Sequence, residues 1–183
     1  MSEPTAAAPT ASTSPGTPGP PDPVTTDRLA LRLISPEDAA GMLAGRRRTS
    51  WHPDYPRRDD QDAVSLVKAD DPQACWGPRH VTRRFDGLVV GSIGFFGAPA
   101  PADDDVPEVE VGFGLVDDAH GHGVAGEALA ALLRHADAAG VRVRAGVRPD
   151  NSASLRVLAR CGFTQLRGTT EEGDLVMVRP QPA

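Results

Sequence analysis

The chain has 183 residues and a formal net charge of −6 at neutral pH. This length suffices for one domain with a hydrophobic core, and the acidic balance does not favour bulk binding to nucleic acid. No stretch approaches the roughly 18 consecutive apolar residues of a membrane span, and the first residues lack the basic start and apolar run of a secretory signal. The sequence therefore predicts a cytoplasmic protein that binds neither nucleic acid nor membranes.

The first part of the chain differs in composition from the rest. Residues 1–24 are almost entirely Ala, Pro, Thr, Ser and Gly, with hardly any large apolar side chain. Such a segment buries too little apolar surface to offset the entropy lost on ordering. We therefore expect a disordered tail over 1–24 and a single domain over 25–180.

The rest of the chain alternates strand-like and helix-like segments. In chain order these are a strand over 28–34, helices over 35–45 and 59–69, strands over 79–85, 88–96 and 108–116, a helix over 126–140, a strand over 141–147, a helix over 150–163 and a last strand over 174–178. Ser35 can cap the first helix, and Asp86-Gly87 is typical of a tight hairpin turn. This order predicts a mixed α/β fold around one sheet, with room for one more short strand around 163–167.

The segment HGHGVAGEAL, residues 120–129, carries the most informative motif. Its histidines, His120 and His122, are candidates for a metal pair. Its glycines match the dinucleotide-binding pattern G-x-G-x-x-G. In a third interpretation, a glycine-rich loop enters a helix and presents unpaired backbone N–H groups, with the positive end of the helix dipole, to another phosphate.

The third interpretation is favoured. A metal site needs three or four ligands, and the nearest further candidates are Asp117, Asp118 and the distant His135, so we predict no metal. In the dinucleotide motif the strand runs directly into the first glycine and several parallel strands follow. Here four residues intervene after the strand, and too little chain follows to build that fold.

Three segments resemble the GNAT family of N-acetyltransferases. The stretch VEVGFGLVDDAHGHGVAGEALAALL (109–133) is similar to the family's core motif, Q/R-x-x-G-x-G/A, which binds the pyrophosphate of acetyl-CoA and is represented here by His120, Gly123 and Ala125. NSASLRVLARCGF (151–163) resembles the family's later helix. TDRLALRLISPEDA (26–39) resembles the start of the subgroup typified by the ribosomal-protein acetyltransferases RimJ and RimL.

The resemblance implies a GNAT fold of the mixed α+β kind. Its sheet is mostly antiparallel, has six to seven strands, and is flanked by about four helices. The co-substrate implied is acetyl-CoA, without a metal. If strands 109–115 and 141–147 splay, backbone groups at the end of the first can pair with the pantetheine arm. The cofactor-binding residues expected from the resemblance are Leu115, Val116, His120, Gly121, His122, Gly123, Val124, Ala125, Gly126, Asn151 and Arg156.

The acid–base groups depart in part from the family's pattern. Many members carry a catalytic tyrosine where this chain has Leu158, and a serine matching Ser154 has been proposed as the acid in the RimJ/RimL subgroup. Acetyl transfer also needs a group that takes a proton from the amine. The resemblance assigns that role to Glu110, with Glu108, on the same strand face, as the second choice.

The acceptor site is expected to come from segments before the core motif, with Trp51, Tyr55 and Trp76 as its walls. The resemblance implies direct transfer of an acetyl group to a primary amine in a ternary complex, the amine being a protein N-terminus or a small molecule. A homodimer is compatible with this assignment. The alternative is a non-catalytic module of the same fold that binds or senses acyl-CoA.

Overall fold

The computed structural model describes residues 17–65 and 67–181. Residues 1–16 of the expected tail lie outside the described residues. Residues 17–24 correct the expected boundary, because they pack on the domain. Trp76 Nε1 donates to the carbonyl oxygen of Thr17 at 3.1 Å, and the buried guanidinium of Arg79 donates to the carbonyl oxygens of Pro20 and Pro21. These contacts supply the burial that the segment's own composition lacks.

The described residues contain four α-helices and two short 3₁₀ helices. The α-helices are α1 (Pro36–Leu43), α2 (Arg58–Val64), α3 (Val124–Ala138) and α4 (Ser152–Arg160), and the 3₁₀ helices span Ala74–Trp76 and Asp117–Ala119. The side chain of Ser35 accepts the N–H of Asp38 at the start of α1, and Asn151 accepts that of Ser154 at the start of α4. Both caps therefore fix where their helices begin.

The described strands form one sheet of nine. The strands are β1 (Val24–Thr25), β2 (Leu29–Leu33), β3 (Pro78–Arg83), β4 (Val89–Phe95), β5 (Ala100–Pro101), β6 (Pro107–Leu115), β7 (Arg142–Val147), β8 (Gln165–Thr169) and β9 (Leu175–Arg179). Their order is β1-β2-β3-β4-β6-β7-β9-β8, and β5 pairs with β6. The predicted fold class is confirmed. Seven strands have five or more residues, and β1 and β5 are two-residue additions.

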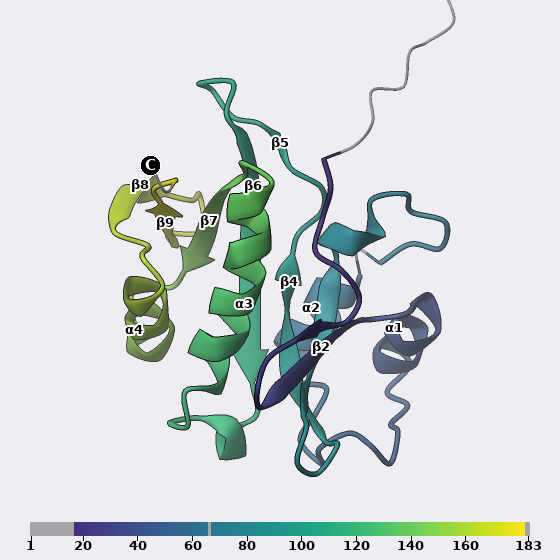
Figure 1. The fold of residues 1–183 in the computed structure, drawn as a ribbon. Helices are drawn as coiled ribbons and strands as arrows, with labels where there is room; N and C mark the ends of the chain where they lie inside the picture. The colour runs from purple at the N-terminus through teal and green to yellow at the C-terminus, as the bar shows by residue number, and fades with distance from the viewer. Residues whose placement is uncertain (1–16, 66, 182–183) are drawn as a thin grey trace, which may run out of the picture.

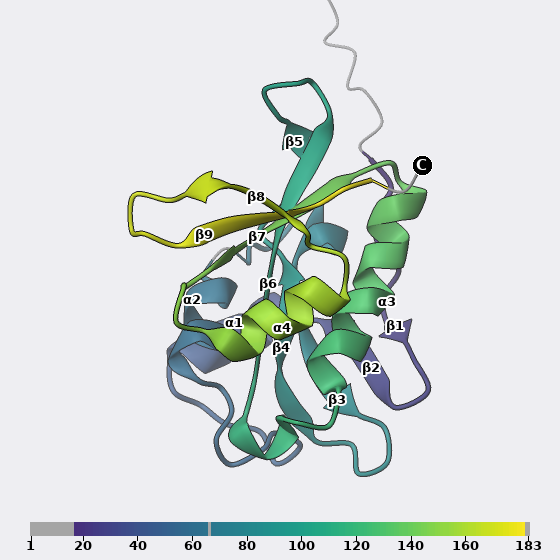
Figure 2. The same cartoon turned by 90° about the vertical axis from the view of Figure 1, so that its left-hand side faces the viewer.

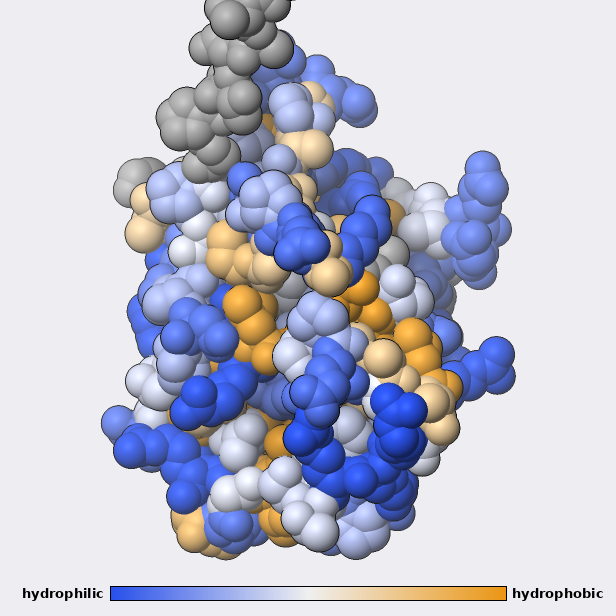
Figure 3. Space-filling view, turned by 90° about the vertical axis from the view of Figure 1, so that its right-hand side faces the viewer, coloured by the Kyte–Doolittle hydropathy of each residue, from blue (hydrophilic) through white to orange (hydrophobic). Residues whose placement is uncertain are grey.

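The helices lie on both faces of the sheet. Figure 1 shows α3 in front of the sheet and α1 and α2 behind it, and Figure 2 shows α4 between α3 and the pair α1 and α2. Side chains of α3 such as Leu129 and Leu132 are fully buried against the strands. The face in Figure 3 is mostly hydrophilic with scattered hydrophobic areas. None of the helices in the described part of the chain is long and apolar enough to cross a membrane.

The sheet opens between β6 and β7, the only parallel pair among the described strands. Their pairing covers Glu108↔Arg142 to Glu110↔Arg144 and then stops. Beyond that point β6 remains paired with β4 as far as Leu115, while β7 remains paired with β9 as far as Val147. The two strand ends therefore separate, and each leaves one edge without a strand partner.

Candidate active site

A cavity of about 310 Å³ lies between the end of β6, the N-terminus of α3 and the first turns of α4. Nine of the eleven residues predicted to bind the cofactor line it. They are Leu115, His120, Gly121, Gly123, Val124, Ala125, Gly126, Asn151 and Arg156. Segments separated by about thirty residues in sequence are thus brought to one site. The N-terminus of α3 faces this cavity.

The entrance to α3 is shaped for an anion. Gly121 and Gly123 have φ values of 77° and 74°, a conformation that side chains other than glycine rarely adopt. Gly123 is the N-cap, and the first main-chain bond within the helix runs from the Glu127 N–H to the Gly123 oxygen at 3.0 Å. The N–H groups of Val124, Ala125 and Gly126 come before that bond and have no acceptor within the helix. They offer a phosphate-sized anion three donors and the positive end of the helix dipole.

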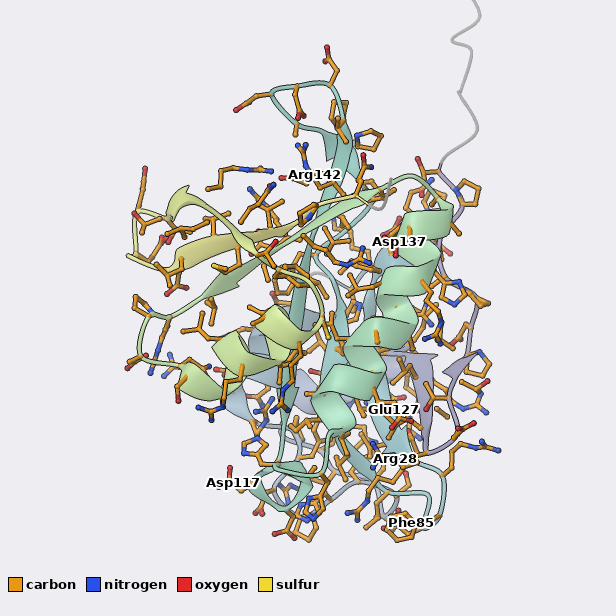
Figure 4. All side chains as sticks on the ribbon, turned by 60° about the vertical axis from the view of Figure 1, so that its left-hand side comes forward. Arg28, Phe85, Asp117, Glu127, Asp137 and Arg142 are labelled. Carbon is orange, nitrogen blue, oxygen red and sulfur yellow. The ribbon has the colours of Figure 1, made fainter. Side chains whose placement is uncertain are left out.

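Glu127, in the first turn of α3, would repel an anion if it faced the cavity. Its carboxylate instead points to the opposite side, where Arg28 Nε donates at 2.6 Å and Thr26 Oγ1 at 2.5 Å (Figure 4). Burial alone would raise the pKa of Glu127, but these hydrogen bonds outweigh it and lower the pKa. Its negative charge is therefore neutralised away from the anion site.

Two predicted cofactor residues do not line this cavity. The N–H of Val116 donates to the Val90 oxygen at 2.8 Å, and its own oxygen accepts the Ala119 N–H at 3.0 Å. The Val116 N–H is therefore not available to the cofactor, which departs from the prediction that the main chain of Val116 binds it. His122 lines a different cavity, with Arg28 and Phe85. In the described part of the chain no three His, Cys, Asp or Glu residues are grouped as metal ligands.

The end of β6 is held by two side chains. The carbonyl oxygen of Leu115 accepts from Arg57 Nη1 at 2.9 Å, and His120 Nε2 lies 3.1 Å from it. The Val116 N–H donates to the Val90 oxygen, and the Phe96 N–H donates to the Glu110 oxygen. The even-numbered residues of β6 therefore direct their backbone groups towards β4. In an antiparallel ladder the intervening residues, Phe113 and Leu115, direct their backbone groups to the other edge, which faces the opening. The Leu115 oxygen is occupied by Arg57 and His120, so an extended amide-bearing ligand can pair there with the backbone groups of Phe113 and the N–H of Leu115.

A second cavity, of about 440 Å³, lies on the α2 side of the sheet. Its walls come from α2, β4, β6, β7 and the start of α4, and the glycines of β6, Gly112 and Gly114, line it. Six residues line both cavities: Arg57, Asp59, Phe113, Gly114, Asn151 and Ser154. The two cavities therefore meet at these residues, which we call the junction.

Ser154 lies at the junction, on the first turn of α4. Its N–H is bound by the capping side chain of Asn151 at 3.0 Å, which leaves the hydroxyl available. Arg156 lines the first cavity together with Arg160, a residue that the sequence interpretation missed. Arg160 follows Arg156 by four residues on the same helix, and residues at that spacing share a helix face, so the sequence could have indicated it.

Glu110 and Glu108 are both engaged in ion pairs. Glu110 lines neither cavity, and its carboxylate lies 3.0 Å from Arg144 Nη2. Glu108 accepts from Arg142 Nε at 2.5 Å and Arg167 Nη2 at 2.6 Å, and only 8% of its side chain is exposed. Burial opposes ionisation of Glu108, but the bonds from Arg167 and Arg142 prevail and lower its pKa. Glu108 therefore stabilises the sheet and is a poor proton acceptor.

The three aromatic residues predicted to wall the acceptor site belong to the core instead. Trp51, Tyr55 and Trp76 are buried and line neither cavity. The Trp51 and Tyr55 rings meet edge to face at 5.5 Å, and the Tyr55 hydroxyl lies 2.8 Å from His80 Nδ1. Large aromatic side chains gain most from full burial, and this outweighs the pattern that placed them at a pocket. Phe96 and Phe113 line the second cavity in their place, and we name it the acceptor-side cavity after the acceptor site that the sequence predicts.

Comparisons with known proteins agree with this fold. The chain matches 99% of an acetyltransferase from Agrobacterium tumefaciens over 92% of its own length, with 21% identity and a TM-score of 0.60. Over 86% of its own length, the chain also matches 88% of Mycobacterium smegmatis RimJ in complex with CoA-disulfide, with 23% identity and a TM-score of 0.55. Over 86% of its own length, the chain matches 92% of RimL, a ribosomal L7/L12 alpha-N-protein acetyltransferase, with 19% identity and a TM-score of 0.56.

These likenesses establish a shared fold. No curated protein gives a significant sequence match. Residues 28–164, which include α3 and both cavities' principal walls, match the family model of the acetyltransferase (GNAT) domain. The chain therefore belongs to the GNAT acetyltransferase family.

Proposed function

We propose that this protein is a RimJ/RimL-like N-acetyltransferase that transfers the acetyl group of acetyl-CoA to a primary amine, on a protein N-terminus or a small molecule. The observation that carries the proposal is the junction, where an anion-binding cavity and a second cavity share six lining residues. Direct transfer requires both substrates to be held together with their reacting atoms in contact. Two cavities that meet satisfy this requirement.

The residues of the first cavity fit acetyl-CoA. The free N–H groups at the start of α3 suit the pyrophosphate, and a Cβ at Gly126 would meet no atom within 4 Å, so the helix surface there is open. Arg156 and Arg160 add positive charge at the same cavity. The open edge at Phe113 and Leu115 suits the amides of the pantetheine arm. When bound, acetyl-CoA would supply the activated acetyl thioester.

The chain's own groups must handle two protons. The amine loses a proton as it attacks, and the sulfur that leaves takes one up. Ser154 is placed for the second task, because its hydroxyl lies at the junction. Glu110, to which the resemblance assigns the first task, is not among the junction residues and is paired with Arg144.

The test is to incubate the protein with acetyl-CoA and a panel of amines and to detect free thiol, alongside thermal unfolding with and without acetyl-CoA. We expect acetyl-CoA to raise the unfolding temperature and at least one amine to release thiol. Protection without turnover on any amine would favour the non-catalytic acyl-CoA module. An unfolding temperature that acetyl-CoA leaves unchanged would exclude both functions.

A further inference from the structure

Asp59, in the first turn of α2, is the only carboxylate among the six junction residues. Its side chain is exposed, and no ion pair or side-chain hydrogen bond joins it to another residue in the described part of the chain. Its charge is therefore free to act on a molecule that enters either cavity.

Asp60 and Glu110 are neutralised, whereas Asp174 lines the second cavity outside the junction and has no ion pair among the described residues. Asp60 is buried and accepts from Arg57 Nε at 2.9 Å, Arg57 Nη2 at 3.0 Å and Ser92 Oγ at 2.5 Å. Glu110 is paired with Arg144. Because Asp60 balances the positive charge of Arg57, the net charge of the junction is that of Asp59. Such a site attracts an ammonium group.

Building on the function proposed above, we propose that Asp59 is a catalytic residue that binds the ammonium of the acceptor and takes its proton during acetyl transfer. A bond forms between the amine nitrogen and the acetyl carbon while the carbon–sulfur bond breaks, and its electron pair leaves with sulfur. The nitrogen of the ammonium loses two protons in all: Asp59 takes the first before the attack and passes it to solvent, and takes the second as the amide forms. The thiolate takes a proton from the hydroxyl of Ser154, which regains one from water.

The same charge selects the class of acceptor. The cationic side chain of Arg148 lines the acceptor-side cavity, but its Nε and Nη2 are each bound to Asp150 at 3.0 Å. No uncompensated cation among the described residues that line this second cavity is left to bind a carboxylate beside the reacting amine. Asp59 repels such a carboxylate. The acceptor is therefore an amine without a carboxylate on the same carbon, as in a peptide N-terminus, and a free amino acid is disfavoured.

The experiment compares the parent with Asp59→Asn, Asp59→Glu, Glu110→Gln and, as a surface control on the same helix, Asp62→Asn. The acceptors are alaninamide and alanine, which differ in the carboxylate. We expect Asp59→Asn to lower kcat/KM for alaninamide by about 100-fold or more, as for loss of a general base. The unfolding temperature and its increase with acetyl-CoA should stay those of the parent. Asp59→Glu should recover part of the activity, and Asp62→Asn should match the parent.

Two readouts separate this role from a structural one. The parent should prefer alaninamide to alanine, and Asp59→Asn should reduce that preference. Calorimetric titration of alaninamide into the protein with CoA should show binding in the parent and weaker binding in Asp59→Asn, which tests the inference even without turnover. Unchanged alaninamide binding in Asp59→Asn would overturn the inference, as would activity lost in Glu110→Gln but kept in Asp59→Asn. Failure of the parent on every amine would count against the proposed function alone.

Discussion

Arg57 Nη1 donates to the carbonyl oxygen of Leu115 at 2.9 Å, and this bond ties the start of α2 to the last residue of β6. The same guanidinium makes two bonds to the buried carboxylate of Asp60. One side chain thus joins the wall of the acceptor-side cavity to the strand end that borders the cofactor cavity. The position of the Arg57 guanidinium depends on the absence of a side chain at Gly114.

Gly114→Ala is expected to disrupt this arrangement. A Cβ at position 114 would lie 2.0 Å from Nη2 of Arg57, which is held on both sides and cannot move away freely. We expect the free energy of unfolding to fall by about 1–3 kcal/mol, the usual cost of overpacking. Urea denaturation measures this loss.

Gly112→Ala is the matched control. Its Cβ would lie 2.5 Å from the Phe96 ring, but Phe96 is 44% exposed and can rotate into solvent. The control should therefore lose less stability than Gly114→Ala. Equal losses in the two variants would show that Arg57 does not depend on Gly114.

The sequence predicted the parts of the fold that local signals determine. The Ser35 cap, the hairpin at Asp86-Gly87 and the glycine-rich entrance to α3 are each set by a few neighbouring residues. The element order then follows from periodicity. The described sheet also has the splayed parallel pair on which the expected cofactor contacts depend.

The parts that long-range packing determines could not be predicted. Arg57 lies in an irregular segment, and only the position of α2 against β6 brings it to Leu115. Glu110 meets Arg144 because of the register between β6 and β7, which the pattern of either strand alone does not specify. Composition likewise could not assign Trp51 to the core, since an aromatic residue suits either a core or a pocket.

Gly126→Ala is expected to change stability and cofactor binding in opposite directions. Position 126 is helical and open, so alanine should raise the free energy of unfolding by up to about 1 kcal/mol. The added methyl group would enter the cofactor cavity, so the increase in unfolding temperature caused by acetyl-CoA should shrink. Gly41→Ala in α1 is the control, because it changes a helical glycine remote from that cavity. If acetyl-CoA raised the unfolding temperature of both variants by the same amount, the assignment of Gly126 to the cofactor site would be contradicted.

Arg156 and Arg160 are expected to recognise the phosphates of the co-substrate. Each alanine substitution should weaken acetyl-CoA binding by about two- to fivefold, the range for exposed ion pairs, and the effect should decrease at high salt. Acetyl-pantetheine, which lacks the nucleotide and its phosphates, should bind the variants and the parent equally. Arg134→Ala, on the exposed part of α3, is the control. Equal weakening for both ligands would mean that the arginines act on the fold rather than on phosphate.

His80 should make stability depend on pH. Burial is the main cause that lowers its pKa, although Asp38 and Asp60 act in the opposite direction. The folded protein thus favours neutral His80, whose Nδ1 lies 2.8 Å from the Tyr55 hydroxyl, while the unfolded chain binds a proton near the ordinary value of 6.5. The unfolded state then holds more protons, so the free energy of unfolding should fall as pH decreases below about 6.5.

Urea denaturation between pH 7.5 and 5.5 measures this slope, and His80→Gln should flatten it, because glutamine does not titrate and its amide oxygen can still accept from Tyr55. His135→Gln is the control: burial also lowers the pKa of His135, but that side chain is only partly buried and should contribute less. If His80→Gln kept the parent's slope, another group would have to bind the protons. Because Tyr55 and His80 lie beneath α1, away from both cavities, the change should affect stability without altering the alaninamide preference that tests Asp59.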